Sequence, residues 1–88
     1  MTEQAIQSKI KKKLEAAGWF VTKLIHTSTP GIPDLLAINK SGKTVFIEVK
    51  RKGNKPSPLQ GYMIEKLQGH NVEALVAYSI EDVQHLFF

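Results

Sequence analysis

The chain has 88 residues, no cysteine, and twelve basic against eight acidic side chains, which gives a formal net charge of +4. This length predicts one domain, residues 1–88, and the missing cysteines exclude disulfide bonds and argue against a zinc site. No apolar run approaches the roughly 20 residues of a membrane span, and the polar start does not resemble a signal peptide, so we expect an intracellular protein. The positive charge is compatible with nucleic-acid binding but does not require it.

Hydrophobic periodicity and turn-forming residues predict seven elements. In chain order they are a helix at 3–17, strands at 19–25, 34–39 and 44–50, a helix at 58–68, a strand at 72–79 and a helix at 80–88. The strands carry apolar residues on both faces, so the sheet needs cover on both sides from helices or from a partner chain. The sequence therefore predicts a single mixed α/β domain.

Each predicted helix begins with a residue that is typical of an N-cap. These residues are Thr2, Ser57 and Ser79. The second helix has the strongest start, because Pro58 suits its first position and Gln60 its third, which together with Ser57 makes a capping box. A serine before the last helix predicts a similar cap there.

The aromatic residues at the two ends of the chain are predicted to be apolar packing groups. Trp19 and Phe20 begin a strand, so we expect them in the core rather than as platforms on which bases stack. For Phe87 and Phe88 two interpretations stay open. They pack the last helix onto the sheet, or they contribute to a dimer interface.

The turn between the second and third predicted strands decides which side chains meet across the hairpin. A two-residue loop would place two lysines opposite each other. A three-residue loop, residues 40–42, instead gives Gly42 the left-handed position of a type I turn with a bulge, where positive φ is needed. We favour the second register, which places Asp34 directly opposite Glu48, at a Cβ separation of about 5 Å.

Lys50 follows two residues after Glu48 and therefore lies on the same face of the strand. Two interpretations fit this group of two acids and a lysine. One is a surface ion pair between Glu48 and Lys50, with Asp34 capping the end of a strand. The other is a divalent metal site, since hard cations favour carboxylate oxygens and promote phosphodiester hydrolysis.

The segments G-I-P-D, residues 31–34, and E-V-K, residues 48–50, resemble the signature of the PD-(D/E)xK nucleases. More narrowly, they resemble the virus-type replication-repair nuclease (VRR-NUC) domain in its small stand-alone form, which adds a glutamate on the first helix and a glutamine on the helix after the motif, here Gln60. The resemblance implies a restriction-endonuclease-like core, with a mixed sheet of about four strands and flanking helices in the order α-β-β-β-α-β-α.

The resemblance also implies roles for individual residues. Asp34 and Glu48 would hold Mg²⁺ or Mn²⁺, helped by the main-chain carbonyl of Val49. Lys50 would orient the attacking water or stabilise charge on the scissile phosphate. Gln60 would lie near Lys50 as a further catalytic residue; the alternative role for Gln60 is the capping box, and both can hold.

The acid on the first helix has two candidates, Glu3 and Glu15. We favour Glu3, because it extends the inward stripe of the helix, whereas Glu15 turns away from that stripe. Glu3 would contribute to catalysis and to the metal, through a water molecule, with Gln7 as a supporting partner. The alternative is an ordinary acid in the first helical turn, stabilised by the helix dipole.

Contacts to DNA phosphates are expected from the two loops that flank the motif. The basic loop after the motif strand supplies Arg51, Lys52 and Lys55. Thr27 and Ser28 precede the motif and have hydroxyl groups that hydrogen-bond phosphate oxygens. The alternative for Thr27 and Ser28 is an ordinary polar loop that does not contact DNA.

From the resemblance we predict a metal-dependent DNA endonuclease that leaves a 5′ phosphate and needs no small-molecule cofactor. The stand-alone members look like Holliday-junction resolvases, so branched DNA, DNA repair, a homodimer and the cytoplasm of a phage-carrying bacterium are expected, and no membrane. The alternative is a non-catalytic nucleic-acid-binding module. Such a module would not require the acids, because acids weaken phosphate binding.

Overall fold

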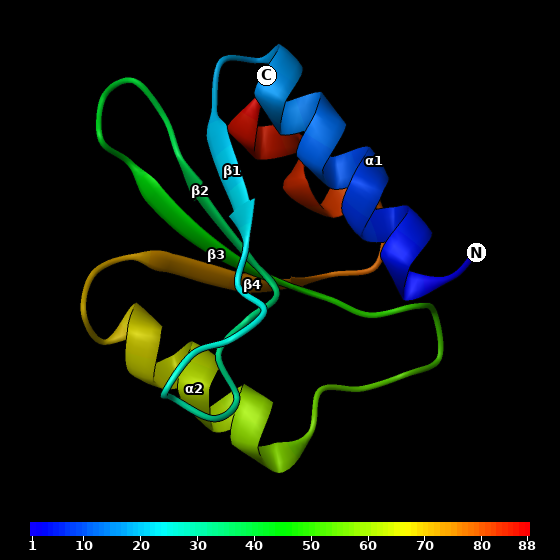
Figure 1. Ribbon diagram of the computed structural model, residues 1–88, viewed down its shortest axis with the longest axis vertical. Helices are drawn as coiled ribbons and strands as arrows, with labels where there is room; N and C mark the ends of the chain where they lie inside the picture. The colour runs from blue at the N-terminus through cyan, green and yellow to red at the C-terminus, as the bar shows by residue number, and fades with distance from the viewer.

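The computed structural model describes residues 1–88 as a four-stranded sheet with helices on both faces (Figure 1). In chain order the elements are α1 (Glu3–Ala16), β1 (Phe20–Lys23), β2 (Leu35–Ile38), β3 (Thr44–Val49), α2 (Pro58–Gln68), β4 (Glu73–Ala77) and η1 (Ile80–Leu86). This order confirms the predicted α/β fold, except that the last helix is a 3₁₀ helix. None of the helices is both long and apolar enough to cross a membrane.

The strands lie in the sheet in their chain order, β1-β2-β3-β4. The first three are joined antiparallel, whereas β4 runs parallel to β3. A parallel neighbour needs a crossover connection, and α2 provides it. Figure 1 shows α2 on one face of the sheet and α1 with η1 on the other. The carboxyl ends of β3 and β4 therefore meet at the same edge of the sheet.

The main core lies between the sheet and the layer formed by α1 and η1. The α1 side chains at helical spacing, Ile6, Ile10 and Leu14, are buried there. They pack against alternate sheet residues, among them Val45 and Ile47, which are fully buried. This alternation confirms the predicted inward stripe of the first helix.

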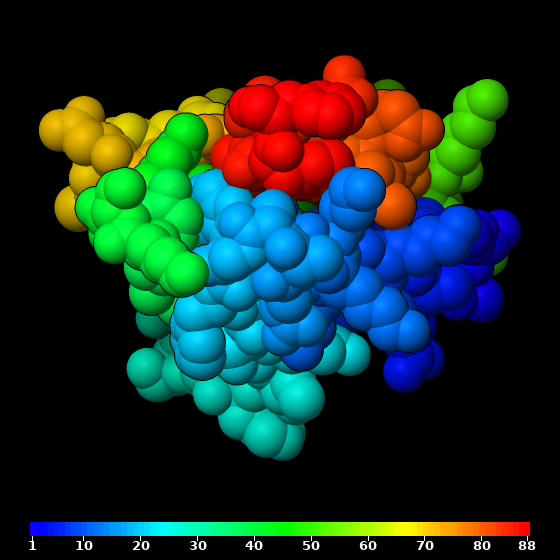
Figure 2. All heavy atoms as spheres, turned by 90° about the horizontal axis from the view of Figure 1, so that it is seen from above, coloured from blue at the N-terminus to red at the C-terminus, as the bar shows by residue number.

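The carboxyl terminus packs against the end of α1 and the start of β1. Trp19 Nε1 donates a hydrogen bond to the Leu86 carbonyl over 3.1 Å, and Lys13 Nζ lies 5.3 Å from the centre of the Phe87 ring. Figure 2 shows these last residues, in red, directly against the light-blue segment that ends α1. Packing thus accounts for Phe87, whereas Phe88 is 94% exposed.

The hairpin turn has the predicted three-residue loop. Asn39 N donates to the Lys43 carbonyl over 3.0 Å, which closes the hairpin at these two residues. Gly42 adopts φ +86°, the left-handed conformation for which glycine was expected. The pairs Leu35 with Ile47 and Ala37 with Val45 show the register, and one further step places Asp34 opposite Glu48.

Two predictions about local structure are wrong. Phe20 is 63% exposed rather than in the core, because it points to the opposite face from Val21, over strands that α2 does not cover. Ser79 makes no side-chain hydrogen bond to η1. Instead, Asp82 Oδ2 accepts the backbone N–H of Tyr78 over 2.8 Å and organises the entry to that helix.

The other helix starts are as predicted. Thr2 Oγ1 accepts the N–H of Ala5 over 3.1 Å. Ser57 and Gln60 form a complete capping box at the start of α2, each side chain bonded to the other's backbone N–H. This cap fixes where α2 begins after the basic loop.

Candidate active site

The segment that carries the first acid is held on both sides. Gly31 has φ +80°, and a Cβ atom there would lie 2.8 Å from Leu59 Cγ and 3.0 Å from its carbonyl oxygen. The loop therefore packs directly on the start of α2, and only glycine fits. The Asp34 carbonyl accepts the N–H of Leu24 over 2.8 Å, which ties Asp34 to the end of β1.

The two acids face each other at the end of the hairpin. Asp34 Oδ2 accepts the backbone N–H of Val49 over 2.9 Å, so one carboxylate oxygen is fixed across the strands. Glu48 is 2% exposed, although it is an acid. Its Oε1 atom is buried and has no hydrogen-bond partner. An unpartnered buried carboxylate oxygen is costly, so its retention needs an explanation.

Burial raises the pKa of Glu48 to about 7, and the charge of Asp34 acts in the same direction. Lys50 opposes this shift, because its Nζ lies 3.5 Å from Glu48 Oε2 and its side chain is only 16% exposed. One lysine cannot balance two ionised carboxylates. Once Glu48 loses its proton, the site therefore carries excess negative charge in a desolvated position, which a further cation would stabilise.

These residues fit a hard divalent cation. Carboxylate oxygens are the ligands that Mg²⁺ and Mn²⁺ prefer, and Mg²⁺ is often held by only one or two carboxylates while it keeps several waters. Asp34 and Glu48 supply such a pair, with Glu48 Oε1 unpartnered. No three acidic, histidine or cysteine side chains gather closely enough to hold a metal by themselves. A contribution from the Val49 carbonyl stays a prediction.

Glu3 lies beside the motif, but its carboxylate binds the basic loop that follows Lys50. Glu3 Oε2 accepts the N–H of Arg51 and the side-chain amide of Asn54, each over 3.2 Å. The hydrogen bond from Asn54, followed by that from Arg51, lowers the pKa of Glu3. Glu15, the other candidate, instead pairs with Lys11 over 2.8 Å. Of the two acids, only Glu3 therefore contacts the basic loop, and its link to a metal stays a prediction.

Gln60 is engaged in the capping box. Its Oε1 accepts the N–H of Ser57 over 2.8 Å. The capping bond uses only the carbonyl oxygen of the side chain, so the amide nitrogen is still available as a donor. The predicted position of Gln60 near Lys50 remains a prediction.

The residues expected to contact DNA lie at the surface. Arg51, Lys52 and Lys55 are exposed in the loop that follows Lys50. The loop before the motif is exposed too, and there the Thr27 hydroxyl donates to the Thr29 carbonyl over 2.9 Å. Sequence reasoning missed Asn54, which contacts Glu3 from 51 residues away, and no local signal predicts such a contact.

A family model described as "VRR-NUC domain" matches residues 1–81. The chain belongs to this family. The matched range includes α1, both halves of the acid–lysine motif, α2 and β4. The resemblance to this family, seen in the motifs, is therefore confirmed.

Known proteins similar to this VRR-NUC domain include a phage protein and solved structures. "Putative nuclease p44" of Acyrthosiphon pisum secondary endosymbiont phage 1 is 31% identical over 58 residues, which are 66% of this chain and 62% of that protein. A solved VRR_NUC domain is 33% identical with a TM-score of 0.85, over 98% of this chain and 95% of its own. A second solved structure, a VRR_NUC domain protein, is 22% identical with a TM-score of 0.76, over 94% of this chain and 82% of its own. At this identity the similarity supports the fold alone.

Proposed function

We propose that this VRR-NUC domain is a metal-dependent deoxyribonuclease. The observation that carries the proposal is the buried Glu48 carboxylate, which lies opposite Asp34 and beside Lys50 with one oxygen unpartnered. Such a group destabilises a fold unless a cation completes it. Membership of the family and the similarity to a phage protein named as a nuclease support the same activity.

The cation that we propose is Mg²⁺ or Mn²⁺, bound by Asp34 and Glu48. When bound there, it would supply Lewis-acid stabilisation of the phosphoryl group and lower the pKa of a coordinated water. Val49 N–H already holds one oxygen of Asp34, which leaves the other as the available ligand. This preorganisation reduces the cost of ordering the site when the cation arrives.

Lys50 would act on the substrate. In the chain alone, its ammonium group lies 3.5 Å from Glu48 Oε2. With Glu48 engaged by a cation, Lys50 would be free to donate to a phosphate oxygen or to the attacking water, and it would stabilise negative charge that develops in the transition state. The oxygen of the attacking water would bond to phosphorus and lose a proton to solvent, as the bond from phosphorus to the 3′ oxygen breaks. The 3′ oxygen would take up a proton and leave as a hydroxyl group, and the other product would keep a 5′ phosphate.

The exposed cations Arg51, Lys52 and Lys55 directly follow this group and suit contacts with the DNA backbone. We further propose endonucleolytic cleavage of branched DNA by a homodimer, whose two-fold symmetry would present one site to each of two strands. The purely binding alternative explains the exposed cations. It leaves the buried Glu48 and the facing Asp34 without a role, since acids repel phosphate.

Cleavage of a panel of DNA substrates tests the proposal. Supercoiled, linear and four-way-junction DNA are incubated with the protein in Mg²⁺ or in EDTA. We expect cleavage only with Mg²⁺, and the junction to be cut fastest. Asp34→Ala and Lys50→Ala should each reduce the rate by more than about 100-fold, since each removes a group that acts in the transition state. Glu65→Ala and Lys66→Ala, at exposed positions on α2, are the matched controls.

Each outcome separates the alternatives. No Mg²⁺-dependent cleavage of any substrate would refute the nuclease, and binding without cleavage would favour the module instead. An active Asp34→Ala variant would overturn the site assignment while leaving the activity in place. Equal rates on all three substrates would contradict only the selectivity for branched DNA.

A further inference from the structure

Tyr78 lies beside the candidate active site, although it comes from a distant part of the chain. It follows β4 directly, and the parallel pairing of Val49 with Ala77 continues by one step to place Tyr78 next to Lys50. Tyr78 lies one residue beyond β4, as Lys50 lies one residue beyond β3, so the two residues lie at the same end of the sheet.

The backbone around Tyr78 is fixed, whereas its ring is partly exposed. Its N–H donates to Asp82 Oδ2 over 2.8 Å, and the neighbouring Ala77 carbonyl accepts the N–H of Lys50 over 3.0 Å. The residue is 37% exposed. A large aromatic group held on a rigid edge, with part of its surface open to solvent, is suited to contact a ligand.

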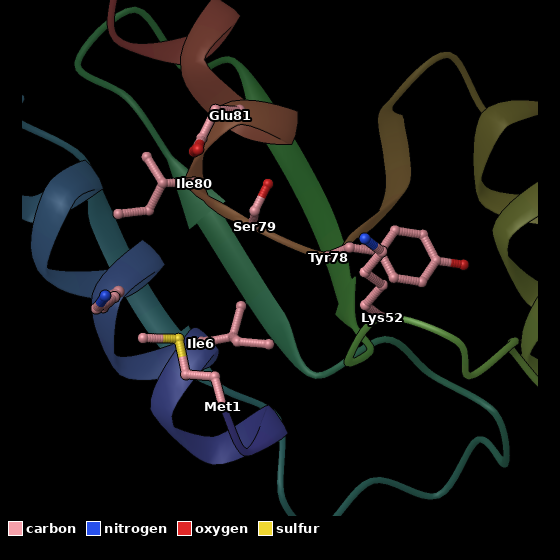
Figure 3. Close-up of a pocket in the computed structure, with 8 residues that line it drawn as sticks. Met1, Ile6, Lys52, Tyr78, Ser79, Ile80 and Glu81 are labelled. Atoms are coloured by element: carbon pink, nitrogen blue, oxygen red, sulfur yellow. The ribbon is translucent and has the colours of Figure 1, made fainter.

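Two adjoining cavities meet at Tyr78 and Lys52. The larger has a volume of about 450 Å³ and lies between the start of α1 and the start of η1. The smaller, of about 350 Å³, opens over the basic loop, where Lys55 and Asn54 line it together with Tyr78 and Lys52. Figure 3 shows the larger cavity, with Tyr78 and Lys52 at one end and Glu81 at the other.

The chemistry of the smaller cavity fits a nucleotide. It combines an aromatic ring with two lysines and contains no acidic side chain. Aromatic rings stack on bases of any sequence, and lysines in the same groove contact the phosphates. Two acids lie in this region: Glu81 lines only the larger cavity, and Glu3, which accepts a hydrogen bond from Asn54, lines neither cavity.

We propose that this cavity binds an unpaired nucleotide of the substrate strand, with its base stacked on Tyr78 and its phosphates on Lys52 and Lys55. A base inside a duplex has both faces covered by its neighbours, so only an unpaired base can stack there. Because Tyr78 adjoins Lys50, the bound nucleotide would lie next to the scissile phosphate. This inference rests on the proposed nuclease function and specifies its substrate as DNA in which a nucleotide beside the cut is unpaired, either in the free DNA or after the protein opens the base pair at a branch point.

The test measures stacking in EDTA, where no cleavage is needed. The probe is a DNA duplex with a short single-stranded overhang that carries 2-aminopurine, whose fluorescence falls when the base stacks. We expect the protein to quench it. Tyr78→Ala should lose the quenching and bind the overhang roughly 5- to 150-fold more weakly, the range for one base–aromatic stack. Tyr78→Phe should keep both, because the ring remains.

Two further variants control the result. Tyr78→Leu keeps apolar bulk without an aromatic ring, so it serves if Tyr78→Ala does not fold, and it should behave as Tyr78→Ala. Tyr62→Ala removes another exposed tyrosine, which lines neither cavity, and should bind as the wild type does. A fully paired duplex should bind all variants equally.

Unchanged quenching and affinity in both Tyr78→Ala and Tyr78→Leu would overturn the inference, as would a loss in Tyr78→Phe as large as theirs. The same DNA with Mg²⁺ separates this inference from the proposed function. If the protein cleaves this DNA but the quenching is the same without the Tyr78 ring, the nucleotide site is refuted and the nuclease function stands. If the quenching needs the Tyr78 ring but no DNA is cleaved, the nucleotide site stands and the nuclease function is refuted.

Discussion

At the scale of single residues, Glu48 is where stability and function conflict. Its carboxylate is almost completely buried, faces a second acid and has one oxygen without a partner. Lys50 alone offsets this only in part. A fold that was optimised for stability alone would place an apolar residue at this position. The conflict therefore supports selection for a bound cation rather than for packing.

The raised pKa of Glu48 predicts how stability depends on pH. Without metal, the folded state keeps the Glu48 proton up to about pH 7, whereas the unfolded chain releases it near its ordinary pKa of 4.5. Between these values the folded state binds more protons, so the free energy of unfolding falls as pH rises, by about 3 kcal/mol in total. Urea unfolding in EDTA from pH 4 to 8 measures this slope.

Glu48→Gln should remove that slope, because an amide does not titrate, and it should be the more stable protein at pH 8. Glu65→Gln, at an exposed position, should keep the slope. The same slope in Glu48→Gln as in the wild type would show that another group is responsible.

At the scale of the elements, the hairpin and the loop before it bring the acids together. The hairpin register follows from where glycine sits in the turn, and the helix starts follow from serine, threonine and proline signals. These features are local, so the sequence was sufficient to predict them. The exposure of Phe20, the missing Ser79 cap and the contact between Glu3 and Asn54 depend on how distant elements pack. Local patterns carry no such information.

The contact between Gly31 and α2 predicts a stability difference between two glycines. Gly31 and Gly42 both have positive φ, so alanine at either position costs about 1–2 kcal/mol of backbone strain. At Gly31 the new methyl group would also overlap Leu59, including its backbone oxygen, whereas nothing lies within 4 Å at Gly42. Gly31→Ala should therefore lose about 1–3 kcal/mol more than Gly42→Ala. Chemical denaturation measures both, and equal losses would contradict the close packing.

At the scale of the whole molecule, the domain is small and leaves aromatic surface open. Phe20 and Phe88 are both well exposed, and a chain of this length has little core to spare. These features support the proposed homodimer. Light scattering at micromolar concentration should therefore give twice the chain mass of 9.9 kDa. A monomer at all concentrations, with and without DNA, would contradict the dimer and would leave the cation site unaffected.

The most direct test of the central claim is a titration with Mn²⁺ at about pH 8, where Glu48 is ionised. Electron paramagnetic resonance measures the free Mn²⁺ at each step of the titration. The wild type should bind one Mn²⁺ per chain. Glu48→Gln should lose this binding, and Glu65→Gln should keep it. Binding by Glu48→Gln that equals the wild type, or no binding by the wild type, would contradict a cation site at Asp34 and Glu48.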